Sequence, residues 1–355
     1  MDRRTTARLI GKEQSMNKSL SLIVLLLSAL AAFGVLTGCG NSKGTVQELR
    51  YVWPEPPDSP RVAYVGTFHG ENDFSGGFGA VMSSLTGKET TIKFSRPFDI
   101  CIAGNGRFYI TDANEGVILY DTKRGKVEPI GEKSTIDLKD PRGIAYANGK
   151  LFIGLAGSKK IAVLDDEGKV ITAIGREGRF PNPIDIVCDT PRHRIYIVDS
   201  KVHQVFAYSE NGDSLFTVGT RGDGDGQLNY PQSAVVDANG NLYVVDGFNY
   251  RVEIFDSTGT YLRQFGKQGD VYGTFARPKG IALDSYQNIY VLDGMHQNFQ
   301  IFNNAGELLM FVGKYSPFNN GFANPVSIAI DGDNTMYVTD NLNSRIQVFR
   351  LLKGD

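Results

Sequence analysis

The residues best suited to chemistry in this chain of 355 residues are polar side chains that follow prolines. Five of them stand one or two positions after a proline, at the start of a short apolar run: Asp99, Arg142, Asp185, Gln232 and Lys279. Carboxylate, amide and cationic groups gathered at one place can recognise a polar ligand or perform acid and base chemistry. We treat these five as candidate binding residues.

Metal chemistry is limited by histidine, because the chain has only four. His203 and His296 lie in comparable polar segments, and His69 and His193 lie in other connections. Zinc sites are built from three or four His, Cys, Asp or Glu ligands. We therefore expect no metal site and no cofactor, with Ca²⁺ or Zn²⁺ as the alternative.

An acidic and basic pattern recurs with one spacing. It is present twice, as Asp246, Asn249 and Arg251 and as Asp340, Asn343 and Arg345. A device repeated in several units is better explained as a local tie, in which the carboxylate accepts backbone N–H bonds and the Arg pairs nearby. The stretch GDGDG (222–226) resembles part of a calcium loop, but it falls in a connection of common length, so we interpret it as a turn.

Aromatic residues outside the apolar runs are candidates for contact with a partner. They are Tyr230, Tyr250, Tyr272, Phe275, Tyr315 and Phe318. Packing beneath loops is the commoner use of such residues, and partner binding is the other. Among them we select Tyr250 and Tyr272, together with His203 and His296, as candidate loop contacts.

All these residues lie within a sequence repeat, which determines where each of them stands in the fold. Six prolines, each before an apolar strand, are spaced by 44, 42, 48, 47 and 47 residues: Pro97, Pro141, Pro183, Pro231, Pro278 and Pro325. Every unit holds four short alternating or apolar runs and no convincing helix, which predicts four antiparallel strands. Four strands repeated radially indicate a β-propeller, so we predict an all-β fold with six four-stranded blades.

The last unit lacks a fourth strand, because the glycine that ends it is due at residue 360 and the chain ends at Asp355. The run RVAYVG (61–66) has the form of LLMFVG (308–313), which ends the preceding unit. We therefore predict that this N-terminal strand completes the last blade and closes the ring, so that the propeller spans residues 61–355. The long gap from Gly66 to Pro97 predicts a short helical insertion near 70–95, around Phe78 to Thr86.

The six repeated units resemble the NHL repeat over about residues 97–355. The clearest matches are RPKGIALDSYQNIYVLD (277–293) and VTDNLNSRIQVF (338–349). Peptidylglycine amidating lyases resemble the same repeat and place zinc-binding His directly after the opening proline, where this chain has none. Lactonase-type propellers use Glu, Asn and Asp around a central calcium, so a metal-dependent hydrolase or lyase acting in the central channel stays the alternative function.

The N-terminus predicts export and lipidation. Residues 20–35 are an apolar run behind Lys18, and the following Leu36-Thr37-Gly38-Cys39 resembles the lipobox of bacterial lipoproteins. We expect residues 1–38 to be a signal peptide that starts at Met1 or Met16, Cys39 to carry the lipid, and residues 39–60 to be a Pro-rich tether. By this resemblance, Gly40 after the Cys favours the outer membrane, with the domain facing the periplasm or the surface.

Charge excludes a nucleic-acid partner, because 37 basic residues balance 39 acidic ones and no basic stripe stands out. Cys101 and Cys188 are interpreted as small buried residues without a disulfide. The expected function is a membrane-anchored, non-enzymatic propeller, monomeric, that binds a protein or ligand of the cell envelope. The resemblance to NHL-repeat lipoproteins supports the architecture more than the activity.

Overall fold

The computed structural model describes residues 51–74, 92–131 and 136–352. The expected signal peptide, Cys39 and the helix around 78–86 lie outside these residues. In the described part of the chain, no helix is long and apolar enough to span a membrane.

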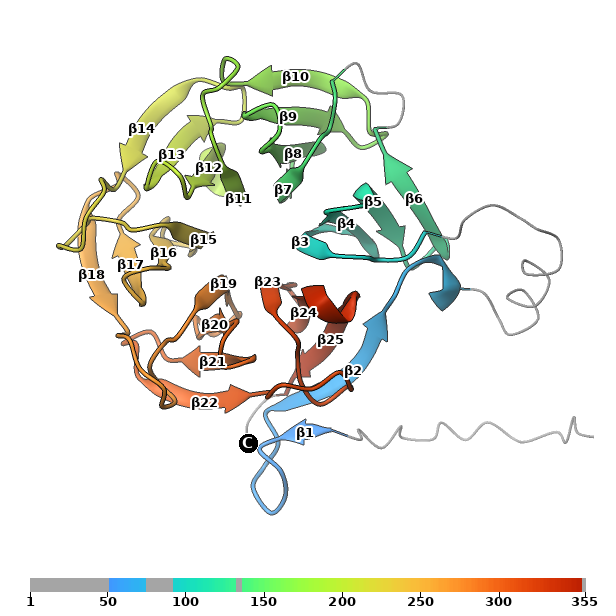
Figure 1. Cartoon of the computed structure of the whole chain (residues 1–355), viewed down its shortest axis with the longest axis vertical. Coiled ribbons are helices and arrows are strands. Elements are labelled where there is room, and N and C mark those ends of the chain that lie inside the picture. Colours follow the sequence, from blue (N-terminus) through green and yellow to red (C-terminus); the bar gives the residue numbers. More distant parts are fainter. Residues whose placement is uncertain (1–50, 75–91, 132–135, 353–355) are drawn as a thin grey trace, which may run out of the picture. The chain divides into compact units, whose positions relative to one another are not determined.

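Six antiparallel sheets stand around a central axis, with the first strand of each sheet innermost (Figure 1). Blades 1 to 3 are β3 (Pro97–Gly104), β4 (Arg107–Asp112), β5 (Gly116–Asp121) and β6 (Lys126–Ile130); β7 (Pro141–Ala147), β8 (Lys150–Leu155), β9 (Lys160–Asp165) and β10 (Val170–Ile174); and β11 (Pro183–Asp189), β12 (Arg194–Asp199), β13 (Gln204–Ser209) and β14 (Ser214–Val218). Blades 4 and 5 are β15 (Pro231–Val236), β16 (Leu242–Asp246), β17 (Arg251–Phe255) and β18 (Tyr261–Phe265); and β19 (Pro278–Leu283), β20 (Ile289–Asp293), β21 (Asn298–Phe302) and β22 (Leu308–Val312).

Blade 6 joins the two ends of the chain. Its strands are β23 (Pro325–Ile330), β24 (Thr335–Asp340), β25 (Arg345–Leu351), β2 (Val62–Phe68) and β1 (Val52–Trp53), in that order. The blue strand β2 lies along the red strand β25 in Figure 1, and their pairing runs from Val62 opposite Leu351 to Phe68 opposite Ile346. The predicted closure and the six-bladed fold are thus confirmed.

Residues 51–60, expected to be part of a stiff tether, instead form β1 and a hairpin loop. The N–H of Arg61 donates to the carbonyl of Trp53 (2.7 Å), which closes that loop. The Trp53 ring lies 6.0 Å from the ring of Phe349 on β25. This packing replaces solvent on the outer side of blade 6, so β1 is an additional fifth strand of the blade.

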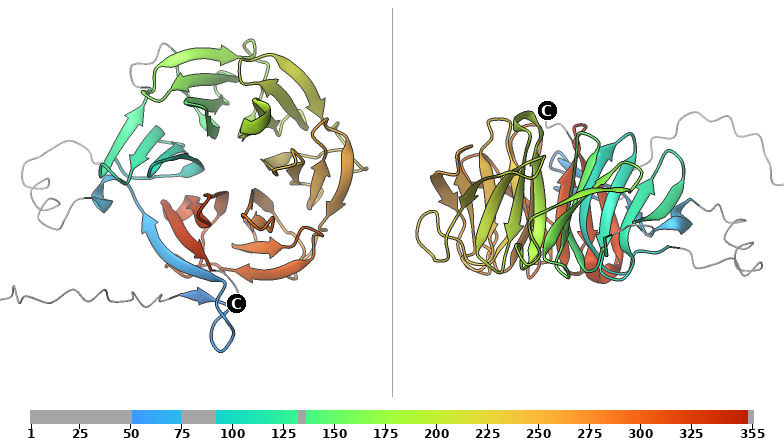
Figure 2. Two further views of the ribbon diagram at one scale, coloured as in Figure 1. Left: turned by 180° about the vertical axis from the view of Figure 1, so that it is seen from behind. Right: turned by 90° about the horizontal axis from the view of Figure 1, so that it is seen from above.

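The only described helices are 3-10 turns at Glu71–Asp73, Thr190–Arg192 and Asn341–Asn343. The inner strands of the blades run roughly parallel to the ring axis in the side view of Figure 2, whereas outer strands such as β10 and β18 lie along the rim in Figure 1. Because successive strands are antiparallel, the connections into each first strand and the loops between second and third strands lie at one end. We call this end the strand-opening face and the other end the opposite face.

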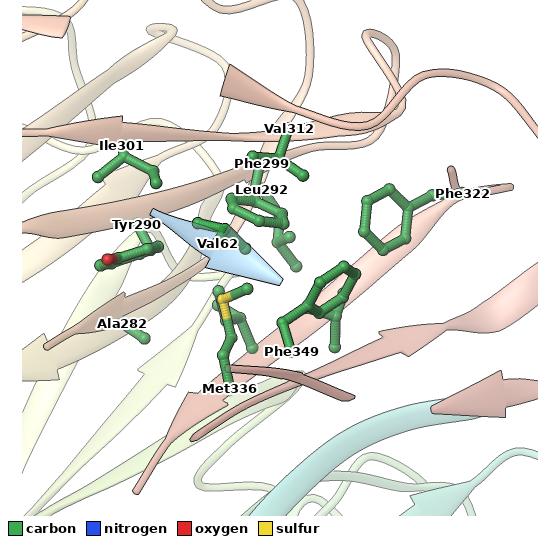
Figure 3. Packing of buried hydrophobic residues seen from close by; sticks show 12 residues of the cluster. Val62, Ala282, Tyr290, Leu292, Phe299, Ile301, Val312, Phe322, Met336 and Phe349 are labelled. Atoms are coloured by element: carbon green, nitrogen blue, oxygen red, sulfur yellow. The ribbon is translucent and has the colours of Figure 1, made fainter. Parts of the chain in front are cut away.

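The core consists of apolar clusters between neighbouring blades, as the alternating patterns predict. Figure 3 shows the cluster at the closing seam, where Val62 of β2 and Phe349 of β25 meet Leu292 and Phe299 of blade 5. Val62 is 1% exposed, which makes the closing strand part of the core. Burial of its side chains stabilises the ring by about 25 cal/mol per Å² of apolar area.

Candidate functional site

A small hollow of about 30 Å³ lies at the channel mouth on the strand-opening face. Four of the five predicted binding residues line it, namely Asp99, Asp185, Gln232 and Lys279. The first strands of blades 1, 3, 4 and 5 change register just after their opening proline. Such bulges disturb strict alternation, so side chains one and two positions after the proline can both reach the mouth.

Asp99 is held at the seam between three blades. Its Oδ2 accepts from the N–H of Ile144 in blade 2 (2.8 Å), and its Oδ1 accepts from the hydroxyl of Ser327 in blade 6 (2.5 Å). The carboxylate is 6% exposed. Burial, together with the neighbouring charge of Asp185, raises the pKa of Asp99 to about 8.

Asp185 repeats this arrangement two blades further on. Its Oδ2 accepts from the N–H of Ala234 in blade 4 (2.8 Å), and burial raises its pKa. Between the two acids, blade 2 has Gly143, where a Cβ atom would collide with the backbone of Asp185. The glycine therefore allows the first strands of blades 2 and 3 to approach closely, and both carboxylates line the same hollow.

Lys279 and Arg142 provide the cations near the mouth. Burial and the charge of Arg277 lower the pKa of Lys279 to about 8. Arg142 does not line the hollow. Its guanidinium instead pairs with Asp140 at 2.8 Å and lies over the ring of Phe98, 5.0 Å from the centroid.

The two candidate histidines have different surroundings. His203 is 5% exposed, and its Nδ1 accepts from the N–H of Tyr230, the residue before the opening proline of blade 4 (3.1 Å). Gln297 performs the same task in blade 5, where its Oε1 accepts from the N–H of Asn324 (2.6 Å). His203 is thus a tie between blades. His296 stands one position earlier in its loop, with Nδ1 3.6 Å from Asp293.

The recurring Asp and Arg residues tie the connections, as their repetition predicts. Arg251 donates from Nε to Asp246 (3.0 Å) and from both terminal nitrogens to carbonyls of the 223–227 connection. Arg345 does the same with Asp340 and the 317–321 connection. The GDGDG stretch is therefore a connection held by an arginine. Among the described residues, no group of three or more His, Cys, Asp or Glu gathers around one point.

Large exposed apolar side chains gather on the strand-opening face. Eight of them lie in the connections and loops of blades 4 to 6: Tyr230, Phe248, Val271, Tyr272, Met295, Tyr315, Phe318 and Leu342. The turns of the opposite face expose only Tyr286 within the described ranges. Tyr315 and Phe318 are each 71% exposed, so this face carries apolar surface that the fold itself does not bury.

The other predicted loop aromatics differ in exposure. Tyr272 is exposed and stacks on Phe311, with ring centroids 3.3 Å apart. Tyr250 instead packs against the cluster between blades 4 and 5, and Phe275 is fully buried. Tyr272 is thus the more exposed of the two candidate loop contacts, and Tyr250 is half-buried.

Ser233 and Ser327 also line the channel mouth, and the sequence interpretation missed them. Both stand two positions after their opening proline, in register with Asp99 and Asp185. Aligning that position across the six units gives Asp, Gly, Asp, Ser, Gly and Ser, a set of small or acidic residues that was available in the sequence.

The fold defines the class of protein, a six-bladed β-propeller, and its repeats are similar to the NHL repeat. A family model described as 6-bladed beta-propeller matches residues 231–306, and the NHL repeat model matches residues 322–349. These two segments fall in blades 4 to 6, where the repeat spacing is most regular. A comparison with curated proteins found no match.

Solved structures share the fold at low sequence identity. A structural genomics protein of unknown function from Bacteroides thetaiotaomicron VPI-5482 has 17% identity and a TM-score of 0.59, over 74% of this chain and 71% of that one. An auxiliary nutrient binding protein from the same organism has 15% identity and a TM-score of 0.56, over 72% and 69%. Virginiamycin B lyase from Staphylococcus aureus has 14% identity and a TM-score of 0.53, over 73% and 96%.

Proposed function

We propose that this protein is a non-enzymatic binding propeller of the bacterial cell envelope that receives a partner protein on its strand-opening face. In this account the lipid on Cys39 holds a monomeric domain at the membrane, which is the outer membrane. Neither a nucleic acid nor a cofactor takes part.

One observation carries the proposal, namely the eight exposed apolar side chains that share one face of three consecutive blades. Tyr, Phe and Met are enriched at the centres of protein interfaces, and clusters of them on a monomer surface mark interaction sites. Apart from the β1–β2 hairpin, the five turns of blades 4 to 6 on the opposite face are different, because they hold no Lys or Arg and six acidic residues, of which the first and third are buried: Asp237, Asp256, Asp284, Glu307, Asp331 and Asp333. A polar, like-charged face is suited to solvent.

Two further features agree with a binding role. The Asp and Arg residues that recur with one spacing form hydrogen bonds with each other within the fold, so they are not free for catalysis. One similar structure carries the name of an auxiliary nutrient binding protein. For the anchor, the support is the lipobox-like sequence that precedes Cys39.

Site-specific photo-crosslinking in the native host tests the proposal. A photoreactive residue is placed at Phe318 on the strand-opening face or, as a matched control, at Tyr286 on the opposite face. Both positions are highly exposed, so neither should disturb folding. We expect a defined protein adduct from position 318 and none from position 286. Adducts of equal yield from both positions, or from neither, would reject the strand-opening face as the interface.

A further inference from the structure

The central channel widens into a chamber beyond the mouth. The chamber has a volume of about 310 Å³ and is lined by the first strands of all six blades. Most of its lining residues have apolar side chains, among them Ile102, Val187, Val235, Leu283 and Ile330, and its exposed wall combines these side chains with polar groups. Cavities of about 300 Å³ in which apolar side chains alternate with a few placed polar groups are typical of small-molecule sites.

The carboxylates of the chamber lie at one end, whereas Tyr146 and Thr190 lie toward the other. Asp99, Asp185, Ser233 and Ser327 line both the mouth hollow and the chamber, so they form the constriction between the two. Neither Lys, Arg nor His belongs to the described lining of the chamber, and Lys279 lines the mouth hollow only. The chamber thus ends at two buried carboxylates that have no cation on its side.

Asp99 keeps room for one more partner. Asp99 accepts the N–H of Ile100 and the hydroxyl of Ser327 on Oδ1 but only the N–H of Ile144 on Oδ2. A carboxylate has about four acceptor positions. An ammonium group has three donors, and its charge would relieve the repulsion between the two acids.

We propose that the chamber binds a small organic cation, a protonated amine joined to an apolar body. The ammonium group lies between Asp99 and Asp185, and the apolar body packs against Ile102, Val235 and Ile330. The site is separate from the apolar loops of the strand-opening face, so its existence does not depend on the proposed protein partner.

Ionisation of the acids sets the pH dependence of binding. The titratable groups that line the chamber are Asp99, Asp185, Cys101, Cys188 and Tyr146. Burial raises the pKa of both thiols, and Tyr146 donates to Asp166, so the two aspartates dominate. Since the pKa of Asp99 is about 8 without ligand, the cation displaces a proton, and affinity should rise from pH 6 to pH 8.5.

Isothermal titration calorimetry of the full chain tests the inference with hexylammonium as the probe. The matched compounds are 1-hexanol, which lacks the charge, and ammonium chloride, which lacks the apolar body. An alkylamine stays protonated up to pH 8.5. We expect saturable binding of hexylammonium alone, tighter at pH 8.5 than at pH 6, with proton release that depends on the buffer.

Three substitutions test whether hexylammonium binds in the chamber. Asp185→Asn should weaken this binding about tenfold or more, since a charge-assisted contact is lost. Val235→Phe, which fills the chamber and leaves both acids in place, should abolish it, whereas Glu177→Gln on an exposed connection should leave it unchanged. Melting curves establish that each variant is folded. Absence of hexylammonium binding at pH 8.5, or equal binding by folded Val235→Phe, would overturn the proposal.

Discussion

Glu253 shows how one ionisable residue makes stability depend on pH. It is 0% exposed on β17, and burial raises its pKa to about 7, against the lowering effect of Arg251. Blades 5 and 6 have Gln300 and Gln347 at this position, and there the amide donates to a carbonyl of the connection. Glutamine therefore fits the site without a charge.

The variant Glu253→Gln should stabilise the protein above pH 7. Because the folded pKa lies above the unfolded value of about 4.5, wild-type stability falls as pH rises between these two values. The gain should be near zero at pH 4.5 and reach about 3 kcal/mol at pH 8.5. Urea unfolding at both pH values measures it. An equal gain at both values would show that Glu253 does not ionise in this way.

Lys159 allows a second residue-scale prediction. It is exposed in the loop after β8 with φ at 56°, a left-handed conformation that favours glycine. His203, Tyr250, Gln297 and Ser344 share this conformation in the corresponding loops, but several of them use their side chains. Lys159→Gly should raise the unfolding free energy by about 0.5–1 kcal/mol in urea titration. A loss of stability would mean that the Lys159 side chain contributes contacts.

At the level of elements, closure depends on β2 and not on β1. The strand β2 pairs along the whole of β25 and buries Val62 and Ala63 in the seam, whereas β1 pairs through two residues only. Removal of β2 would leave β25 as an open edge and expose part of the core.

Two truncations separate these roles. A chain that begins at Pro60 retains β2 and should keep a cooperative melting transition, lower by a few degrees because the contact of Trp53 with Phe349 is lost. A chain that begins at Gly70 lacks β2 and should lose the transition. Circular dichroism during heating measures both. Equal melting of the two chains would refute closure by β2.

The elements show why prediction succeeded in part. The six first strands and the closing strand follow from the regular repeat, since each blade must complete its sheet to bury its faces. The hairpin of β1 did not follow from the sequence, because a Pro-rich segment alone indicates an extended chain and its packing on Phe349 depends on tertiary context. The sequence analysis did not predict that Ser327 lines the channel mouth together with Asp99, because a bulge after each proline interrupts the alternation of side chains along the strand.

At the scale of the molecule, the proposed function assigns anchoring to the N-terminus and binding to the propeller. If Cys39 carries the lipid, Cys39→Ser should move the protein from the membrane fraction to the soluble fraction of the host, because the lipid is the anchor in this account. Fractionation with an antibody against the propeller measures this. Retention of the variant in the membrane fraction would contradict lipidation as the anchor.

The strand-opening face is the basis of the proposed function, and substitutions there separate binding from folding. Tyr315 and Phe318 are exposed, so replacing both with serine should leave the melting temperature almost unchanged. An exposed pair on the outermost strands, Leu262 and Leu309, serves as the matched control.

Quantitative affinity purification of the anchored protein from crosslinked host membranes tests the central claim most directly. The account predicts one envelope protein enriched with wild type and with the Leu262→Ser/Leu309→Ser control, and lost, by about tenfold or more, with Tyr315→Ser/Phe318→Ser. Unchanged recovery of that partner with the Tyr315→Ser/Phe318→Ser protein, or no enriched partner with wild type, would contradict it.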